Sequence, residues 1–274
     1  MSLLENYHIA VPTAFDKNED LNTEATIKHI QYLNDIGIKS VLVCASTGEQ
    51  HSLTLKEKFE LLDCLSNLNL NEDFNLIFGV SSIRQKEAIQ LAKKVHDTPE
   101  VSTILIGYSP YILPTQDEAL KYTHLIISAA GKPAIIYNNP LRTGFDLSVD
   151  SFEKIVNDND LIVGLKEAGD PHKISEIKKG VTKSLNYYIG GEKELESKIK
   201  FGYNSLSSIA GNVYPKEIEQ WFSALLNKDV NDNYDDLQIK IDEIFSNSPL
   251  PYIKKQISKK EHIDFGICRT PLGN

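Results

Sequence analysis

The sequence predicts an α/β protein, a (β/α)8 barrel with a C-terminal helical extension. Three observations lead to this fold. The chain has 274 residues, of which 41% are hydrophobic, and this is enough to bury a large core. Short β-branched or aromatic runs alternate with amphipathic stretches of helical period. Several runs, such as residues 134–136, are continuously apolar, which is typical of parallel strands covered by helices on both faces.

Eight runs have the composition and length of buried strands: His8–Thr13, Ser40–Cys44, Asn75–Val80, Ser102–Gly107, Ala134–Asn138, Leu161–Lys166, Asn186–Gly190 and Leu206–Gly211. Eight strand–helix units in roughly 250 residues fit a closed barrel. An open, doubly wound sheet is the alternative architecture. It would need a Gly-x-Gly-x-x-Gly motif after the first strand to bind a dinucleotide, and the sequence has no such motif there.

Helical stretches separate these runs, among them Thr23–Ile36, Thr54–Leu68, Arg84–His96, Gln116–Ala130 and Ser148–Asn157. In the second stretch, Thr54 and Glu57 have the spacing of a capping box, which favours a helix start at this point. After residue 227 the chain predicts two further helices, Val230–Phe245 and Tyr252–Ser258. We therefore expect one catalytic barrel over residues 1–226 and a helical extension over residues 227–274 that packs on it.

Charge and composition exclude several classes of function. The formal net charge is −9, and the basic residues are spread among the acidic ones, which argues against a nucleic-acid or anionic membrane partner. No apolar run approaches the ~18–20 residues of a membrane span, and the first residues do not resemble an export signal. Three widely spaced cysteines, Cys44, Cys64 and Cys268, predict buried reduced thiols. We expect a cytoplasmic protein.

Lys166 is the strongest candidate for a catalytic residue. In a barrel of this kind, functional side chains gather at the C-terminal ends of the strands, and Lys166 ends a hydrophobic run. Burial there would lower the pKa of the amine, because a dry environment disfavours the charged form. A neutral amine can attack a ketone and form a Schiff base. The alternative is a surface lysine that forms an ion pair with Glu167.

Other strand ends carry further candidates. Tyr137 could relay protons, or it could be a core tyrosine whose hydroxyl is satisfied. Ser46 and Thr47 could hold a carboxylate, although Ser-Thr-Gly is also ordinary turn chemistry. Arg142 could clamp a second carboxylate, or it could simply be solvated. Tyr111 could be an aromatic residue of the rim or an interface anchor.

The sequence predicts no metal and no cofactor. The histidines and cysteines show no His-x-x-x-His or Cys-x-x-Cys spacing. A Gly-x-Ser-x-Gly elbow and a phosphate-binding Gly-Lys-Ser/Thr loop are also missing from the sequence.

Three ordered motifs resemble the dihydrodipicolinate synthase and N-acetylneuraminate lyase superfamily, and they are Ser46–Glu49, Tyr137–Gly144 and Gly164–Ala168. The likeness extends over nearly the whole chain, to the closing residues 269–272. It implies a Schiff-base (β/α)8 enzyme that uses pyruvate or another 2-oxo acid and needs no metal for its chemistry. It also implies a homo-oligomer, a dimer or tetramer.

The resemblance further implies individual roles. Lys166 is similar to the imine-forming lysine and Tyr137 to the proton-relaying tyrosine. Ser46 and Thr47 resemble the pair that holds the pyruvate carboxylate and joins the relay. Tyr111 resembles a tyrosine that reaches into the neighbouring subunit's site.

Two more positions bear on substrate binding. Gly191 resembles a backbone contact to the substrate. Ser207 lies where the family usually has an aliphatic residue that touches pyruvate through its backbone.

Some positions distinguish the branches of the superfamily. Arg142 and the run Lys166–Ala168 resemble the synthases, in which the arginine holds the carboxylate of aspartate semialdehyde, whereas Ser46 resembles the lyases. Leu55 and Ile83 replace the histidine and asparagine of lysine-inhibited synthases, so we expect weak or absent feedback by lysine.

The expected reaction is the condensation of pyruvate with aspartate semialdehyde to 4-hydroxy-tetrahydrodipicolinate, a step of lysine and diaminopimelate biosynthesis. The alternatives are a pyruvate-dependent aldolase for a sialic or other sugar acid, and a catalytically silent barrel that binds a small acid.

Overall fold

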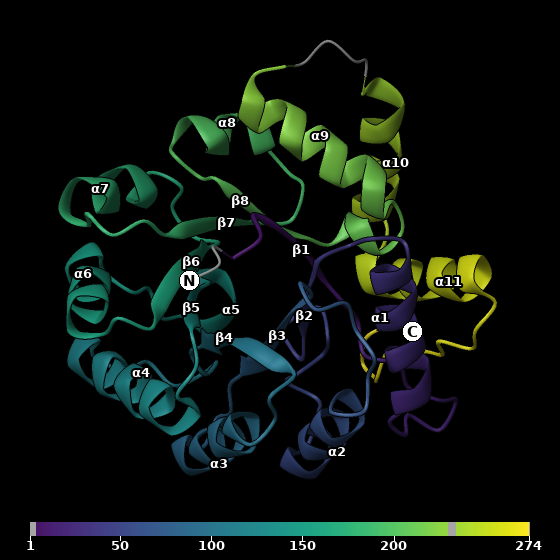
Figure 1. The fold of residues 1–274 in the computed structure, drawn as a ribbon, viewed down its shortest axis with the longest axis horizontal. Helices are drawn as coiled ribbons and strands as arrows, with labels where there is room; N and C mark the ends of the chain where they lie inside the picture. The colour runs from purple at the N-terminus through teal and green to yellow at the C-terminus, as the bar shows by residue number, and fades with distance from the viewer. Residues whose placement is uncertain (1–3, 230–233, 274) are drawn as a thin grey trace.

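The computed structural model describes residues 4–229 and 234–273. Within these residues, eight parallel strands form one closed barrel in the order β1 to β8 (Figure 1). The strands are β1 (Tyr7–Ala10), β2 (Ser40–Val43), β3 (Asn75–Val80), β4 (Val101–Gly107), β5 (Ala134–Asn138), β6 (Ile162–Glu167), β7 (Asn186–Gly190) and β8 (Ser205–Ser208). The predicted (β/α)8 barrel is therefore confirmed.

Helices surround the barrel (Figure 1). They are α1 (Thr23–Asp35), α2 (Leu55–Leu65), α3 (Gln85–His96), α4 (Gln116–Ala130), α5 (Pro140–Thr143), α6 (Val149–Asp158), α7 (Lys173–Gly180), α8 (Leu195–Lys200), α9 (Pro215–Asn227), α10 (Asp235–Ser246) and α11 (Pro249–Glu261), with a 3-10 turn η1 (Ala210–Asn212) after β8. The capping box at Thr54 and Glu57 is confirmed. The Thr54 side chain accepts from the backbone N–H of Glu57, and the Glu57 side chain accepts from the backbone N–H of Thr54. Both N–H groups at the start of α2 are therefore satisfied.

Three predicted strands match the structure at both ends, whereas β1, β2 and β8 end earlier than predicted. The chain leaves β1 before Thr13, because the Thr13 hydroxyl donates to the carbonyl of Gly48 at 2.7 Å. The second strand stops before Cys44, whose φ of 56° lies in the left-handed region. The eighth strand stops at Ser208, because the chain then tightens into η1. The strand ends are therefore set by loop contacts and loop conformation, and the local sequence pattern does not show these.

The helical extension also differs in detail from the prediction. Residues 230–233 of the predicted Val230–Phe245 helix lie outside the described residues, and α10 begins at Asp235. The last helix is longer than Tyr252–Ser258, because a proline at its first position, Pro249, starts it earlier. The division of the chain at residue 226 stays a prediction.

The three cysteines are free thiols. Cys44 and Cys268 are buried as predicted, but Cys64 is only partly buried, because it lies at the edge of the inward face of α2, next to the buried Leu65. In the part of the chain that the structure describes, none of the helices has the length and apolar character needed to cross a membrane.

The barrel interior and the helix layer form two separate apolar clusters. Apolar side chains fill the interior, including Ala10, Leu42, Ile77, Leu105 and the large Tyr188. The larger cluster packs the outer faces of the strands against the helices. Because the interior is filled, the C-terminal rim of the strands is the place where side chains can meet a substrate.

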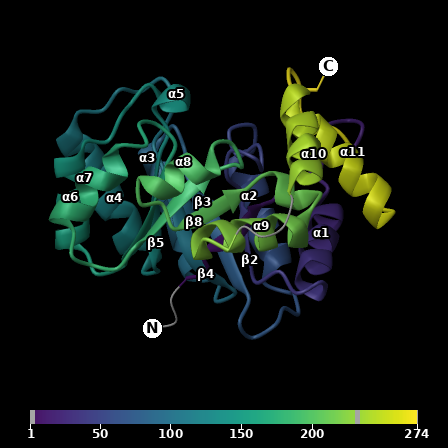
Figure 2. The same cartoon turned by 90° about the horizontal axis from the view of Figure 1, so that it is seen from above.

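The helical extension lies on the rim side of the barrel. In Figure 2, α10, α11 and the C-terminus lie on the same side as α5, which follows a strand end, and the N-terminus lies on the opposite side. Lys254 of α11 donates to Glu49 at 2.6 Å and to the carbonyl of Ile267 at 2.7 Å, and the Lys254 and Glu49 side chains are both buried. The backbone N–H of Arg269 donates to the second carboxylate oxygen of Glu49. The extension is thus joined to the loop that carries Ser46 and Thr47.

Breaking this ion pair should destabilise the fold. We expect Lys254→Met to lower the free energy of unfolding by about 3 kcal/mol, because Glu49 would keep a buried charge without its cation. Urea-induced unfolding at pH 7 measures the change. The control is Lys28→Met, which removes an exposed pair with Glu24 and should have little effect. Equal effects of the two variants would contradict the prediction.

Candidate active site

A cavity of about 730 Å³ opens at the C-terminal rim of the barrel. Four of the predicted site residues line it: Ser46, Tyr111, Tyr137 and Arg142. They come from the loops after β2 and β4, from the end of β5, and from α5. Lys166 lies beside this group, with its Nζ 4.8 Å from the centre of the Tyr137 ring. The structure therefore brings together a lysine, a phenol, a hydroxyl and an arginine.

Besides Lys166, three predicted site residues do not line this cavity. Thr47 is partly buried beside Ser46. Gly191 follows β7, has a φ of 93°, and uses its N–H to donate to the carbonyl of Ser207 at 3.0 Å. Ser207 is fully buried, and its side chain contacts Lys166. Their predicted contacts with substrate stay predictions.

Lys166 is buried at the end of β6, with 7% of its surface exposed. Its Nζ donates to the Ser207 hydroxyl at 2.8 Å. Burial lowers the pKa of the amine, and Arg142 lowers it further, whereas Tyr137 and Glu192 act in the opposite direction. The alternative interpretation, a surface lysine paired with Glu167, is wrong, because the Glu167 carboxylate instead accepts from Asn138 and the N–H of Gly169.

Tyr137 is the strand partner of Lys166 across β5 and β6. Burial raises the pKa of its phenol, but Lys166, hydrogen bonds from Asn139 and Ser46, and Arg142 outweigh burial and bring the pKa below its usual value of 10.0. The Asn139 side chain donates to the phenol oxygen at 2.6 Å. A phenol of lowered pKa, close to a buried amine, is suited to moving protons at that amine.

Asn139 was not identified from the sequence, in which it occupies a variable place within the Tyr137–Gly144 motif. Besides its bond to Tyr137, its carbonyl accepts from the N–H groups of Arg142 and Thr143. The same residue thus orients the phenol and anchors the short helix that carries the arginine.

Arg142 is exposed and lines the cavity. Among the described residues, no carboxylate lies within ion-pair distance of its guanidinium. An arginine without an acidic partner at a cavity wall can bind a carboxylate of a ligand through two parallel hydrogen bonds.

Tyr111 is 92% exposed and has a φ of 67°. Other exposed apolar side chains accompany it at this edge of the rim: Ile83, Ile112, Leu113 and Leu141. The Tyr111 side chain is thus directed towards solvent. Its predicted role in a neighbouring subunit's site stays a prediction.

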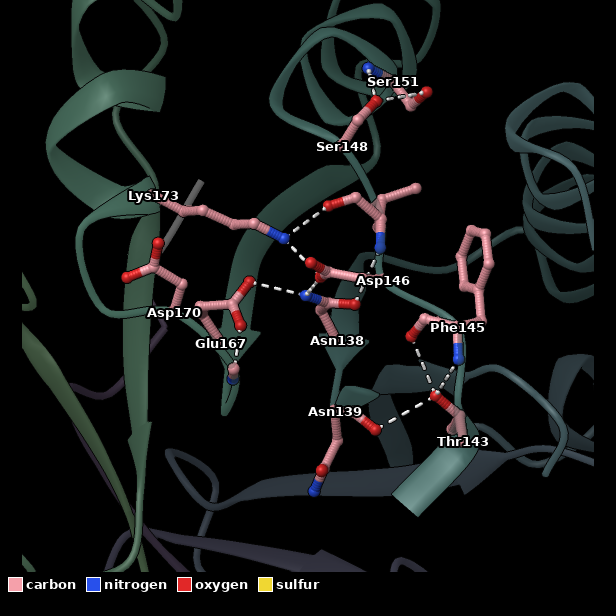
Figure 3. A network of polar contacts seen from close by, with 12 residues as sticks. Asn138, Asn139, Thr143, Phe145, Asp146, Ser148, Ser151, Glu167, Asp170 and Lys173 are labelled. Atoms are coloured by element: carbon pink, nitrogen blue, oxygen red, sulfur yellow. Dashed lines mark hydrogen bonds and ion pairs between the residues drawn. The ribbon is translucent and has the colours of Figure 1, made fainter. Parts of the chain in front are cut away.

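A polar network behind the site joins the ends of β5 and β6 (Figure 3). The Asn138 amide donates to Glu167 and to Asp146, both at 2.8 Å, and Lys173 forms an ion pair with Asp146. The backbone N–H of Leu147 donates to the Asn138 side chain at 3.0 Å. Asn138 and Glu167 directly follow Tyr137 and Lys166, so this network helps to hold Tyr137 and Lys166 in register. The sequence signal for Asn138 and Glu167 was their position in the motifs Tyr137–Gly144 and Gly164–Ala168.

Glu192 anchors the loops after β7 and β8. One of its buried carboxylate oxygens accepts from the Ser208 hydroxyl at 2.5 Å and from the N–H groups of Ile209 and Ala210 at 2.9 and 3.0 Å. Burial raises the pKa of this carboxyl. Across residues 4–229 and 234–273, no cluster of three or more histidine, cysteine, aspartate or glutamate side chains is arranged to hold a metal ion.

A sequence model of the Dihydrodipicolinate synthetase family matches residues 4–274. The chain belongs to this family. A 4-hydroxy-tetrahydrodipicolinate synthase of Ligilactobacillus salivarius is 28% identical to it, over 97% of this chain and 93% of that protein. One from Methanosphaera stadtmanae is 27% identical, over 98% and 92%. The protein is thus an enzyme of the lyase type that characterises this family.

Solved structures show the same fold. The dihydrodipicolinate synthase of Aquifex aeolicus superposes with a TM-score of 0.87 at 24% identity, over 98% of this chain and 92% of that one. A sialic acid aldolase of Ruminococcus gnavus has a TM-score of 0.85 at 19% identity, over 97% and 90%. At these identities the likeness shows the fold alone. Both synthases and aldolases share it.

The network in Figure 3 predicts a pH-dependent stability. Burial raises the pKa of Glu167 from 4.5 to about 7, although hydrogen bonds from Asn138 and Gly169 act against it. A carboxyl whose pKa is raised on folding stabilises the protein below the unfolded pKa, and this contribution is lost as the pH rises through the folded pKa. For Glu167 the loss falls between about pH 4.5 and 7 and is on the order of 2–3 kcal/mol.

Glu167→Gln tests this dependence, because glutamine stays neutral throughout. The wild-type free energy of unfolding should fall more steeply between about pH 4.5 and 7 than that of the variant, as measured by chemical denaturation. The exposed Glu60 on α2 provides the control, Glu60→Gln. Parallel pH profiles for wild type and Glu167→Gln would contradict the prediction.

Proposed function

We propose that this enzyme condenses pyruvate with aspartate semialdehyde to 4-hydroxy-tetrahydrodipicolinate through a Schiff base on Lys166. The observation that supports it most is the buried Lys166 amine, of lowered pKa, next to the Tyr137 phenol. The names of its relatives support the same reaction. The proposal requires no metal and no cofactor, because the lysine itself supplies the electron sink.

The first step is imine formation. The neutral amine of Lys166 adds to the keto carbon of pyruvate, and the keto oxygen leaves as water, whose two hydrogens come in net from the amine. Tyr137, with Ser46 beside it, moves these protons. In this proposal Ser46 and Thr47 hold the pyruvate carboxylate at the end of β2, and the backbone near Gly191 and Ser207 contacts pyruvate from the other side.

The second step forms the carbon–carbon bond. A proton leaves the methyl carbon of the imine and another is taken up at its nitrogen, which gives an enamine. The enamine carbon attacks the aldehyde carbon of the second substrate, the aldehyde oxygen takes up a proton and becomes the hydroxyl, and the nitrogen gives one up and becomes an imine again. Arg142 holds the carboxylate of that substrate. The amino group of the second substrate then adds to the imine carbon and displaces Lys166, which closes the ring and frees the enzyme. Positioning both reactants in one cavity supplies a large part of the rate enhancement.

An aldolase that cleaves a sialic or other sugar acid is the second candidate. It would use the same lysine and tyrosine, and sialic acid aldolase is among the solved structures with this fold. Arg142 favours the synthase, because an uncompensated arginine suits a substrate that carries a second carboxylate. A catalytically silent barrel is the third candidate. The buried Lys166 amine, with its lowered pKa, argues against it.

We further propose that the enzyme is a cytoplasmic homo-oligomer, a dimer or tetramer. The exposed Tyr111, Leu113 and Leu141 form an apolar edge beside the cavity, and an edge of this kind is typical of a protein interface. Through it, Tyr111 would reach the site of a second subunit. We also expect lysine to inhibit weakly or not at all, as inferred from Leu55 and Ile83.

Borohydride reduction in the presence of pyruvate tests the Schiff base. We expect wild type to gain the mass of one reduced pyruvate on Lys166, located by peptide mass spectrometry, and Lys166→Ala to gain none. The rate should rise with pH with a midpoint below the ordinary lysine pKa of 10.5, because burial lowers the pKa of the amine. A wild-type protein that stays unmodified would refute both enzyme hypotheses.

Arg142→Ala separates the two candidates. For a synthase we expect the KM for aspartate semialdehyde to rise by about 10–100-fold, because a bidentate contact is lost. Pyruvate trapping should stay close to the wild-type rate when each protein is compared on its own pH plateau, because Arg142 also lowers the pKa of Lys166 and its loss shifts the pH profile. Coupled assays with pyruvate and aspartate semialdehyde, and separately with sialic acid, measure the two activities. Arg84→Ala is the control, because Arg84 pairs with Glu87 at the surface. Turnover of sialic acid alone would favour the aldolase.

A further inference from the structure

The floor of the site, beneath Lys166, is formed by β7, β8 and β1. Gly190 of β7 pairs with Ser207 of β8, and Ser207 pairs in turn with His8 of β1. Gly190 has no side chain, and a Cβ placed on it would lie 3.4 Å from Cε of Lys166. The lysine stem therefore passes over Gly190, and Nζ reaches the Ser207 hydroxyl at 2.8 Å.

His8 is fully buried in this floor. Its ring lies 4.7 Å from that of Tyr188, and neither of its ring nitrogens has a hydrogen-bond partner among the described residues. Burial lowers the pKa of His8 well below 6.5, and Lys166 adds to this effect, so the imidazole is neutral at pH 7. Burial likewise keeps the neighbouring Tyr188 protonated.

The chemistry of a Schiff-base lysine makes two demands on this floor. The amine must be held in one place, yet it must be free to lose its charge. A carboxylate partner would satisfy the first demand but would stabilise the ammonium form. A hydroxyl satisfies both, because its oxygen accepts an N–H and its own proton can turn towards the lone pair of a neutral amine.

The same hydroxyl can serve after the imine forms. A protonated imine carries one N–H and a positive charge, and a hydroxyl oxygen that accepts this N–H makes a charge-assisted hydrogen bond. A second cation beside the imine would oppose it, whereas the neutral His8 does not.

We propose that Ser207 is a positioning residue, whose side-chain hydroxyl holds Lys166 Nζ for attack and then accepts the N–H of the iminium, with His8 as its uncharged neighbour. This inference rests on the proposed Schiff-base function. It gives the Ser207 side chain a role distinct from the backbone contact expected from the family resemblance.

Three variants test the inference. Ser207→Ala removes only the hydroxyl, which is a single heavy atom, and Ser207→Thr keeps the hydroxyl. Ser205→Ala is the matched control, because Ser205 is an equally buried serine on the same strand whose hydroxyl bonds with Asn186 and Asn204 instead. Thermal unfolding first establishes that each variant is folded. The rate of imine formation is then measured by borohydride quenching at a series of times and pyruvate concentrations.

We expect Ser207→Ala to slow imine formation about tenfold at saturating pyruvate, the effect of one lost hydrogen bond at the reacting atom. Its half-saturating pyruvate concentration should be unchanged. Ser207→Thr should recover most of the rate, and Ser205→Ala should match wild type. A loss of packing alone would not be restored by threonine.

Several results would overturn the inference. One is a wild-type rate in Ser207→Ala, and another is equal slowing in Ser205→Ala. A third is a folded Ser207→Thr that reacts no faster than the alanine variant. A wild-type enzyme that forms no adduct is a separate result, which refutes the proposed function and this inference with it.

Discussion

The structure depends most on the burial of one amine at the end of β6. The pKa of Lys166 lies below that of an ordinary lysine because the barrel removes the amine from water. Its surroundings supply hydrogen-bonding groups without placing a carboxylate in contact with it: the Ser207 hydroxyl is on one side and the Tyr137 ring on the other. Together these contacts leave the nitrogen held in place yet able to act as a nucleophile.

The closed barrel explains why these groups meet. Parallel strands bring their C-terminal ends to one rim, so residues far apart in sequence become neighbours. Side chains that point inward from β5, β6 and β8 meet there: Lys166 contacts both Tyr137 and Ser207. Those that follow Tyr137 and Lys166 point outward, where Asn138 and Glu167 bind each other. Alternation along a strand thus separates the reactive group from the group that braces it.

The rim residues could be predicted because each depends on a local pattern. An apolar run that ends in Lys166 or Tyr137 indicates a strand end, and in this fold strand ends carry function. The contacts of Asn139, His8 and Ser207 could not be predicted. Lys166 and Ser207 are separated by 41 positions and meet only when β6 and β8 close around Gly190.

The burial of particular polar groups could not be predicted from the sequence either. Nothing in the local pattern around His8 shows that both of its ring nitrogens lack a partner among the described residues. Similarly, the Ser46–Glu49 motif predicts a turn, but it does not show that Glu49 pairs with a lysine 205 positions later. Such contacts depend on the packing of the whole chain.

The bond between Lys254 and Glu49 has a consequence for biosynthesis. A ribosome delivers the loop after β2 early, but the Lys254 cation that pairs with Glu49 follows 205 residues later, and the Arg269 N–H that completes the contacts of Glu49 follows 220 residues later. Until then the Glu49 carboxylate lacks its ion-pair partner, so the turn that bears Ser46 is not held in its folded position. A nascent barrel without these residues, or one cut by a protease before them, would keep Lys166 at the end of β6 but lack the contacts that hold the loop bearing Ser46 and Thr47.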